Sequence, residues 1–168
     1  MKIIVACCKN MGIGYKNKIP WYLPPDLKYF KDLTSKDKNA SLIMGKNTWV
    51  SLKKKPLPNR KNIILSTTLN QNDVNQYDNT FVFQNTDDLN HYITEKKDYI
   101  WIIGGEKVYK EFIHHENLTD IYLTNILHDF KVDTYFPNIP KNFNLKYNTR
   151  VRNCNKLFYT YSRYTKNI

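Results

Sequence analysis

A single carboxylate stands in a stretch that is otherwise basic or apolar. Ile13–Lys31 contains three prolines, and Asp26 is its only acid. Pro24 and Pro25 suit the first turn of a helix, where a missing N–H costs nothing. An acid in that turn is favoured by the helix dipole. Position alone therefore explains Asp26 as a helix-start residue.

The neighbours of Asp26 favour a chemical role as well. In a helix that begins near Pro24, Leu27 and Phe30 belong to the apolar face, which Asp26 borders. Burial beside that face raises the pKa of a carboxyl group, while the helix dipole lowers it. A carboxyl with a raised pKa is a useful proton donor or hydrogen-bond anchor near neutral pH. Both interpretations of Asp26 stay open at this point.

Two glycine sites stand between a predicted buried strand and a predicted helix. Gly45 precedes Lys46-Asn47-Thr48, and Gly104-Gly105 precede a second helix start. Backbone can approach a phosphate closely at such a junction. Neither site has the P-loop sequence, and a tight turn explains the glycine pair equally well. Together they suggest a ligand with separated anionic groups, such as a nucleotide cofactor whose extra phosphate Lys46 would bind.

Three other polar residues are candidates for binding. Ser66 and Thr67 follow a buried strand and offer hydroxyl groups beside the same ligand. Arg60 is one of four arginines in a lysine-rich chain. Arginine can bind a carboxylate through two hydrogen bonds, although Arg60 taken alone is more simply a surface residue.

No metal site is predicted. The chain has three cysteines and four histidines, and neither set has the spacing of metal ligands. The odd cysteine count also argues against a disulfide framework, which favours a reducing, cytoplasmic location. The N-terminal apolar run is too short for a signal sequence or a membrane span.

The elements that position these residues are predicted from two patterns. Continuous apolar runs predict buried strands, and alternating apolar and polar residues near the C-terminus predict antiparallel strands. Strands are expected over residues 2–8, 40–44, 61–66, 81–83, 99–103, 121–126, 143–150 and 156–164. Helices are expected over 24–36 and 46–52, from an N-cap at Thr86, and over 106–114, with loops over 9–23 and 67–80. We therefore expect one domain over residues 1–168 with an α/β fold. Its twisted eight-stranded sheet is mixed and mainly parallel, ends in an antiparallel C-terminal hairpin, and is flanked by about four helices. Ligands bind such sheets beyond the carboxyl ends of the strands.

The net charge of +11 allows two classes of partner. Nucleic acid would bind through its phosphates, and small anionic ligands would be steered by the field. The basic residues are spread along the chain, and no nucleic-acid-binding motif accompanies them. We therefore expect no nucleic-acid partner.

Five motifs, in order and spacing, resemble those of dihydrofolate reductase over nearly the whole chain. They are Ile19-Pro20-Trp21-Tyr22-Leu23-Pro24-Pro25-Asp26-Leu27 with Phe30-Lys31, Ile43-Met44-Gly45-Lys46-Asn47-Thr48-Trp49, Pro56-Leu57-Pro58-Asn59-Arg60-Lys61-Asn62, Ile102-Ile103-Gly104-Gly105 with Val108-Tyr109, and Asp133-Thr134-Tyr135-Phe136-Pro137. Each motif is weak alone, and the five together are specific.

The resemblance implies reduction of 7,8-dihydrofolate to 5,6,7,8-tetrahydrofolate with NADPH, in support of one-carbon metabolism and nucleotide synthesis. Hydride would go to pterin C6 while N5 is protonated. Asp26 would bind the pterin and promote that protonation through water, Trp21 would order the water, and Thr124 would hydrogen-bond the acid. The remaining substrate residues implied are Ile4, Val5, Leu27, Phe30, Leu52, Leu57, Ile103 and, for the glutamate α-carboxylate, Arg60.

For NADPH, the resemblance implies contacts from the loop, from both glycine sites and from the residues after the third strand. These residues are Ala6, Ile13, Gly14, Lys46, Asn47, Thr48, Leu65, Ser66, Thr67, Ile103, Gly104, Gly105, Glu106, Lys107, Val108 and Tyr109. The Gly104–Gly105 peptide bond would be cis. Lys46 replaces the arginine of many members, which weakens the expected preference for NADPH over NADH. Glu106 fits beside a pyrophosphate only if it points away.

Two other functions within the fold remain alternatives. A related pterin or flavin-pathway reductase is disfavoured by the first motif and by Arg60. A catalytically inactive folate-binding relative is disfavoured by the presence of both Asp26 and Trp21. We expect a cytoplasmic monomer that binds dihydrofolate and antifolate inhibitors.

Overall fold

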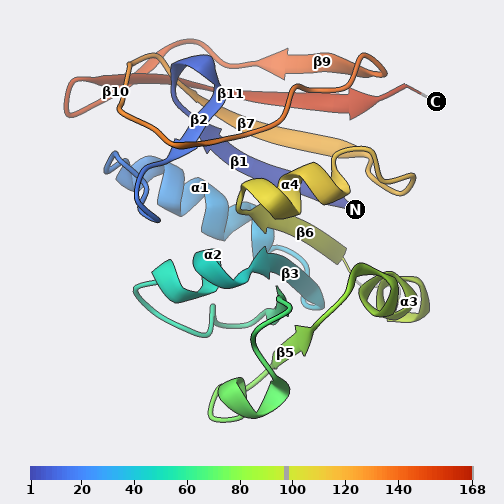
Figure 1. The fold of residues 1–168 in the computed structure, drawn as a ribbon. Helices are drawn as coiled ribbons and strands as arrows, with labels where there is room; N and C mark the ends of the chain where they lie inside the picture. The colour runs from blue at the N-terminus through green and yellow to red at the C-terminus, as the bar shows by residue number, and fades with distance from the viewer. Residues whose placement is uncertain (97–98, 168) are drawn as a thin grey trace.

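The computed structural model describes residues 1–96 and 99–167 (Figure 1). The strands are β1 (Lys2–Cys7), β2 (Gly12–Gly14), β3 (Ala40–Gly45), β4 (Lys61–Leu65), β5 (Thr80–Phe83), β6 (Tyr99–Gly104), β7 (Asp120–Ile126), β8 (Thr134–Tyr135), β9 (Phe143–Asn148), β10 (Arg152–Cys154) and β11 (Leu157–Lys166). The helices are α1 (Pro24–Thr34), α2 (Lys46–Ser51), α3 (Thr86–Lys96) and α4 (Glu106–Phe112), with short 3-10 helices η1 (Lys9–Met11) and η2 (Gln71–Val74).

The main sheet has the strand order β10-β11-β7-β1-β6-β3-β4-β5. Strand β9 also pairs with β11, on the edge that β10 shares, because β7 occupies the other edge. The pairs from β7 across to β5 are parallel, whereas β11 is antiparallel to β7, β9 and β10. The predicted mixed, mainly parallel sheet of eight strands with an antiparallel C-terminal hairpin is thus confirmed. Strand β9 adds a ninth strand beside the eight in this order.

Helices cover both faces of the sheet, because its central strands are apolar on both sides. In β1, Ile3 and Val5 pack in the cluster that includes α3 and α4, whereas Ile4 packs in the cluster that includes α1 and α2. The carboxyl ends of β1, β3 and β6 therefore lie between α1 on one face and the start of α4 on the other (Figure 1).

Several local predictions are wrong in detail. The helix after β5 is capped by Asn85 and not by Thr86, since Asn85 Oδ1 accepts a hydrogen bond from the Asp88 N–H at 2.8 Å. The predicted loop over 67–80 contains η2, and the loop over 9–23 contains β2, which pairs with β8. Such short elements have too few residues to show an apolar period.

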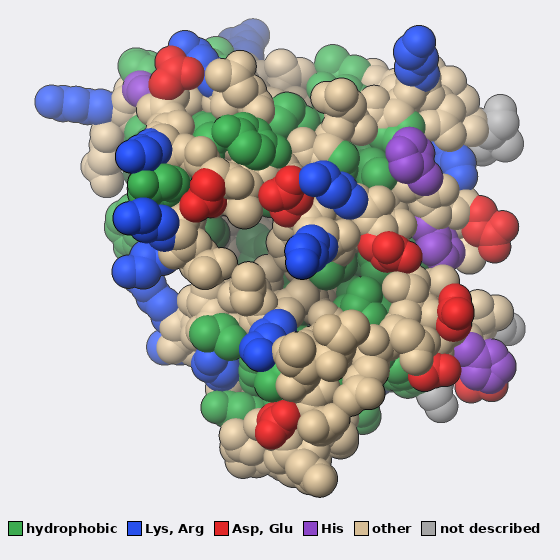
Figure 2. Space-filling model, in the orientation of Figure 1, with side chains coloured by type: hydrophobic (Ala, Val, Ile, Leu, Met, Phe, Trp, Pro, Cys, Tyr) green, Lys and Arg blue, Asp and Glu red, His purple; other side chains and the backbone are tan. Residues whose placement is uncertain are grey.

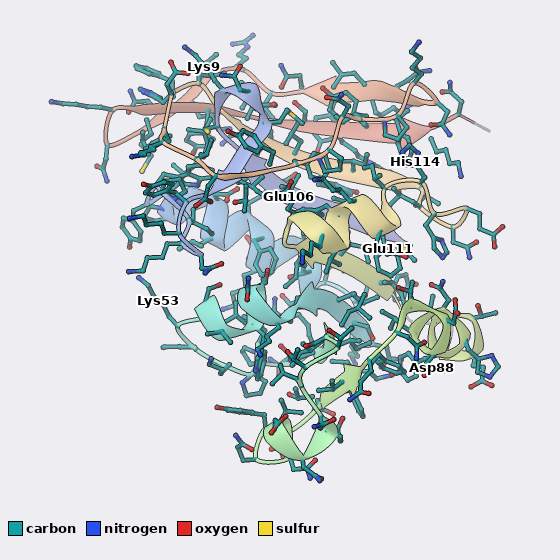
Figure 3. The ribbon with its side chains drawn as sticks, viewed as in Figure 1. Lys9, Lys53, Asp88, Glu106, Glu111 and His114 are labelled. Atoms are coloured by element: carbon teal, nitrogen blue, oxygen red, sulfur yellow. The ribbon has the colours of Figure 1, made fainter. Side chains whose placement is uncertain are left out.

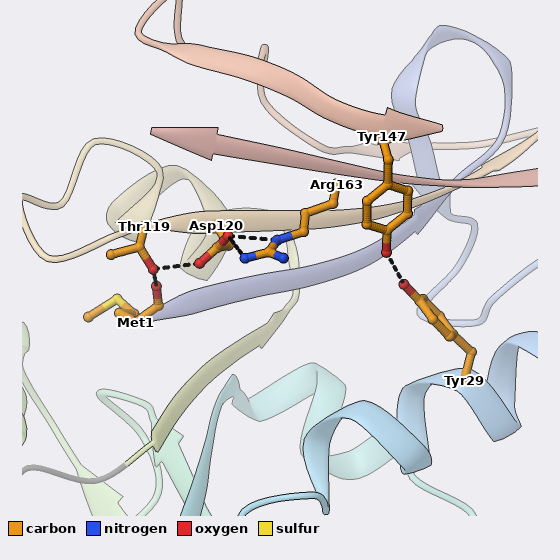
Figure 4. A network of polar contacts seen from close by, with 6 residues as sticks. All are labelled: Met1, Tyr29, Thr119, Asp120, Tyr147 and Arg163. Carbon is orange, nitrogen blue, oxygen red and sulfur yellow. Dashed lines mark hydrogen bonds and ion pairs between the residues drawn. The ribbon is translucent and has the colours of Figure 1, made fainter. Parts of the chain in front are cut away.

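A polar network connects Met1, Thr119, Asp120 and Arg163 at the amino ends of β1 and β7 (Figure 4). Arg163 Nη2 lies 2.8 Å from Asp120 Oδ1. The Thr119 hydroxyl lies 2.8 Å from Asp120 Oδ2 and 3.0 Å from the Met1 carbonyl oxygen, and these two acceptors share its one proton. The Asp120 carboxylate is thereby buried with a cation and a donor, as a buried acid requires. None of the described helices is long and apolar enough to span a membrane.

Candidate active site

A cleft of about 1000 Å³ lies at the carboxyl ends of the central strands. It appears in Figure 2 as a hollow with hydrophobic side chains at its floor and both basic and acidic side chains around its rim. The predicted site residues that line it are Ile4, Val5, Ala6, Ile13, Gly14, Trp21, Asp26, Leu27, Phe30, Lys46, Asn47, Thr48, Leu52, Leu65, Ser66, Thr67, Ile103, Gly105, Glu106, Lys107, Val108 and Tyr109. Residues drawn from most of the chain therefore meet in one cavity.

Asp26 lies in the first turn of α1 and is held by a side chain of β7. The Thr124 hydroxyl donates to Asp26 Oδ1 at 2.6 Å, and Thr124 itself is 1% exposed. Thr124 pairs with Ala6 on one side and Tyr161 on the other, so the sheet fixes its position. The predicted contact between a helix-start acid and a strand threonine is confirmed.

Burial determines the protonation of Asp26. Desolvation raises the pKa of this carboxyl from 3.8 to about 6, and the Thr124 hydrogen bond opposes the shift without cancelling it. The apolar neighbours Leu27 and Phe30 line the same cleft. A carboxyl group with this pKa exchanges its proton close to neutral pH.

Arg60 is not the surface residue that its sequence position alone suggested. It is only 6% exposed, and its Nη1 donates to the Thr34 hydroxyl at 2.7 Å while its Nε donates to the Pro58 carbonyl at 3.0 Å. The guanidinium carbon lies 5.9 Å from the centre of the Phe30 ring. Arg60 is thus fixed behind Phe30, outside the residues that line the cleft itself.

The loop that carries Arg60 is held by one buried amide. Asn62 is 0% exposed, and its side chain accepts from the Leu57 N–H and donates to the carbonyls of Leu57 and Arg60. Leu57 packs against the core cluster under α1 rather than lining the cleft. Asn62 therefore determines where both predicted substrate residues of this loop lie.

The two glycine-led helix starts lie side by side across the cleft wall. A Cβ atom on Gly45 would lie 3.2 Å from Val108 Cγ2, and one on Gly105 would lie 3.4 Å from the Thr48 hydroxyl. Glycine at both positions keeps the backbones of α2 and α4 close together. Gly104, which does not line the cleft, has φ 109° and would place a Cβ 2.9 Å from the Tyr109 ring; its peptide bond to Gly105 is cis.

The cation of Lys46 is positioned by the Thr68 hydroxyl, which the residue pattern did not predict. Lys46 Nζ donates to the Thr68 hydroxyl at 2.9 Å, and the Ser66 hydroxyl accepts from the backbone N–H groups of Thr68 and Leu69. Ser66 and Thr67 line the cleft beside them. A cation and several hydroxyl groups therefore converge at the carboxyl end of β4.

The side chain of Glu106 points along its own helix, as predicted for an acid beside a pyrophosphate site. Glu106 lies at the start of α4 (Figure 3), and its carboxylate forms an ion pair with Lys110 at 2.6 Å. Lys107, one residue on, lines the cleft with no such acid partner among the described ion pairs.

The phenol of Tyr109 is occupied within the protein. Its hydroxyl donates to the Ile4 carbonyl at 2.9 Å, and burial raises its pKa well above its ordinary range. Tyr109 therefore supports the cleft wall and does not act as an acid near neutral pH.

The segment from Ile13 to Leu23 is anchored by one acid from a distant loop. Asp133 Oδ2 accepts from the Lys16 N–H at 2.8 Å, and the Asp133 N–H donates to the Gly14 carbonyl at 2.9 Å. A Cβ on Gly14 would lie 2.6 Å from the Thr134 hydroxyl, so glycine permits this close pairing of β2 with β8.

Further cleft residues were not predicted as ligand contacts. They are Asn17, Lys18, Ile19, Ser51, Thr68, Gln84, Asn85, Thr86, Glu111 and Thr134, whereas Gly45, which also lines the cleft, was predicted as a phosphate-approach site. Most of these lie in loops or at helix starts, where only the fold reveals which side chains face inward. No group of metal-binding side chains occurs among the described residues.

Comparisons with known proteins match this chain over most of its length. The family model described as dihydrofolate reductase matches residues 1–166. A dihydrofolate reductase of Buchnera aphidicola is 45% identical over 139 residues, covering 82% of this chain and 78% of the relative. The enzymes of Heliothis virescens and Gallus gallus are each 38% identical, over 149 and 157 residues, and each match covers 84% of this chain and 80% of the relative.

The raised pKa of Asp26 predicts that this acid lowers the stability of the protein at neutral pH. Below about pH 3.8 both states hold the proton, and between 3.8 and about 6 the unfolded chain ionises first, so the free energy of unfolding falls as pH rises. We expect Asp26→Asn, which keeps an acceptor for Thr124, to raise the free energy of unfolding by about 1–3 kcal/mol at pH 8. At pH 4 most of this gain should vanish.

Urea denaturation at both pH values measures the difference. Asp32→Asn, an exposed acid of the same helix paired with Lys28, serves as the matched control and should show no such gain. An equal effect of Asp26→Asn at both pH values would contradict the assigned pKa.

Proposed function

The chain belongs to the dihydrofolate reductase family, NADPH-dependent oxidoreductases that reduce 7,8-dihydrofolate to 5,6,7,8-tetrahydrofolate, and we propose which groups of its cleft perform this reaction. The observation that carries the proposal is the desolvated Asp26, which faces the same cavity as the two glycine-led helix starts. The test is loss of NADPH absorbance on addition of dihydrofolate, and no loss would refute it.

Asp26 binds the pterin and controls its protonation. With a pKa of about 6, the carboxyl group holds a proton in an appreciable fraction of molecules near neutral pH. It promotes protonation of N5 through a water molecule that Trp21 orders. Thr124 keeps the carboxyl oriented toward the cleft through its 2.6 Å hydrogen bond. Ile4, Val5 and Ile103 form the apolar surface around the pterin.

The other end of the substrate meets apolar side chains and one arginine. Leu27, Phe30 and Leu52 hold the p-aminobenzoyl ring, and Leu57 supports them from the core cluster behind the cleft lining. Arg60 binds the α-carboxylate of the glutamate tail. The described hydrogen bonds of Arg60 use Nε and Nη1, so Nη2 is the nitrogen that they leave for a ligand. Thr34 and Asn62 act as positioning residues for this contact.

The cleft residues suit NADPH, which when bound supplies the hydride for pterin C6. The missing side chain of Gly105 leaves space in the wall, and the 1000 Å³ volume exceeds the need of one small ligand. Gly105, Glu106, Lys107 and Val108 would hold the pyrophosphate, and Gly104 would support them from behind the cleft lining. Ala6, Ile13, Gly14 and Tyr109 enclose the nicotinamide. Lys46, Asn47, Thr48, Leu65, Ser66 and Thr67 hold the adenosine end and its extra phosphate.

We further propose that residues 1–168 act as one domain and as a monomer in the cytoplasm. Antifolates compete with dihydrofolate in this cleft, and nucleic acid is not a partner. The same absorbance assay with an antifolate, together with the mass in solution, tests these points.

Removing the acid of Asp26 should abolish most turnover without removing the cofactor site. We expect Asp26→Asn to lower kcat at pH 7 by roughly 100-fold or more, because positioned acid groups contribute about that much. The wild-type rate should fall as pH rises through about 6, as Asp26 loses its proton, and the variant should lack this step. Asp32→Asn is the control. Near-wild-type turnover of Asp26→Asn would contradict the role of Asp26 in protonation.

Lys46 should distinguish NADPH from NADH. Because its Nζ is held by Thr68 at the predicted phosphate position, Lys46→Ala should raise the KM for NADPH by about 10-fold and leave that for NADH nearly unchanged. Steady-state kinetics with both cofactors measure this. Lys54→Ala, outside the cleft, is the control, and equal changes for the two cofactors would exclude Lys46 as the phosphate contact.

Thr34 should affect only substrates that carry a glutamate tail. Thr34→Val removes the acceptor of Arg60 Nη1, so the KM for dihydrofolate should rise about 5- to 10-fold. A dihydropterin without the tail should show no change, and Thr34→Ser should restore the wild-type KM. A rise of the same size for both substrates would mean that Thr34 serves only stability.

A further inference from the structure

A second cavity of about 360 Å³ lies on the back of α1, between this helix and the C-terminal strands. Lys28, Tyr29 and Asp32 face it, whereas Asp26, Leu27 and Phe30 of the same helix line the active-site cleft. No described residue lines both cavities. We call this cavity the tyrosine groove, and α1 is the wall that separates it from the cleft.

The groove has aromatic walls that stay uncharged. The Tyr29 ring stacks on Tyr161 with a centroid distance of 4.0 Å and an interplanar angle of 29°. The Tyr29 hydroxyl lies 3.3 Å from the Tyr147 hydroxyl of β9 (Figure 4). Burial raises the pKa of Tyr29 and of Tyr161 above their ordinary range, so these phenols are neutral near pH 7. Such walls suit a flat apolar ring.

The charged side chains that line the groove are Lys28, Asp32 and Arg152, so its net charge is positive. Lys28 and Asp32 form an ion pair with each other along α1. Arg152 of β10 lies with its guanidinium carbon 5.5 Å from the Tyr161 ring centre, and it has no acid partner among the ion pairs of the described residues. A guanidinium held against an aromatic face presents its N–H edge to a carboxylate.

We propose that the tyrosine groove is a second ligand site, which takes a small planar aromatic carboxylate with its ring against the tyrosines and its carboxylate on Arg152. The volume of 360 Å³ is at the lower end of ligand cavities, so the ligand is a one- or two-ring compound. The site is distinct from the substrate cleft, because the two cavities share no lining residue.

The probe is 2-naphthoate, titrated into the protein with its cleft filled by NADPH and folate. Calorimetry should show one saturable site per chain. Arg152→Gln should weaken binding about five-fold or more. Arg150→Gln is the matched control, since this arginine lies two positions away and does not line the groove. The neutral analogue 2-naphthylmethanol should bind more weakly than 2-naphthoate to the wild-type protein.

Three outcomes would overturn the site. They are absence of saturable binding, equal affinity in Arg152→Gln and Arg150→Gln, and binding that occurs only when the cleft is empty. The last outcome would place the probe in the substrate cleft. The experiment requires no turnover, so its failure leaves the proposed catalytic roles intact, and an inactive enzyme would not affect its result.

Discussion

The active site depends on keeping one carboxyl group in a place where its charge is poorly solvated. Asp26 projects from the first turn of α1 into a cleft with apolar walls, and the Thr124 hydroxyl holds it there. Burial prevails over the hydrogen bond from Thr124, which is why the pKa of the acid is raised. The rest of the fold must resist the tendency of this group to move toward water. The parallel strands do so by fixing Thr124, and the packing of α1 does so by fixing the acid.

A second constraint comes from the approach of two helix starts to one another. The starts of α2 and α4 follow neighbouring parallel strands, β3 and β6, so both lie at the same edge of the sheet. A side chain at Gly45 would press on Val108 Cγ2, and one at Gly104 would press on the Tyr109 ring, so these neighbours would have to shift. Glycine at these positions therefore keeps the two helix starts close together.

Sequence patterns predicted the parts of this arrangement that are local. The buried strands follow from continuous apolar runs, and the position of Asp26 follows from Pro24-Pro25. Contacts between distant segments were not predictable from residue patterns. The burial of Arg60 depends on Thr34 of α1 and on Asn62, and neither partner has a sequence period that points to Arg60. The resemblance to a known family supplied the pairing of Asp26 with Thr124, which lies 98 residues further along the chain.

The two faces of α1 are coupled by helix geometry. Residues three positions apart lie on adjoining parts of a helix surface, so Tyr29 cannot shift far without moving the turn that carries Asp26. Tyr29 is fixed by a stack on Tyr161, and Tyr161 pairs in register with Thr124, the residue that holds Asp26. The acid and the aromatic contact behind it therefore rest on the same two adjacent strands.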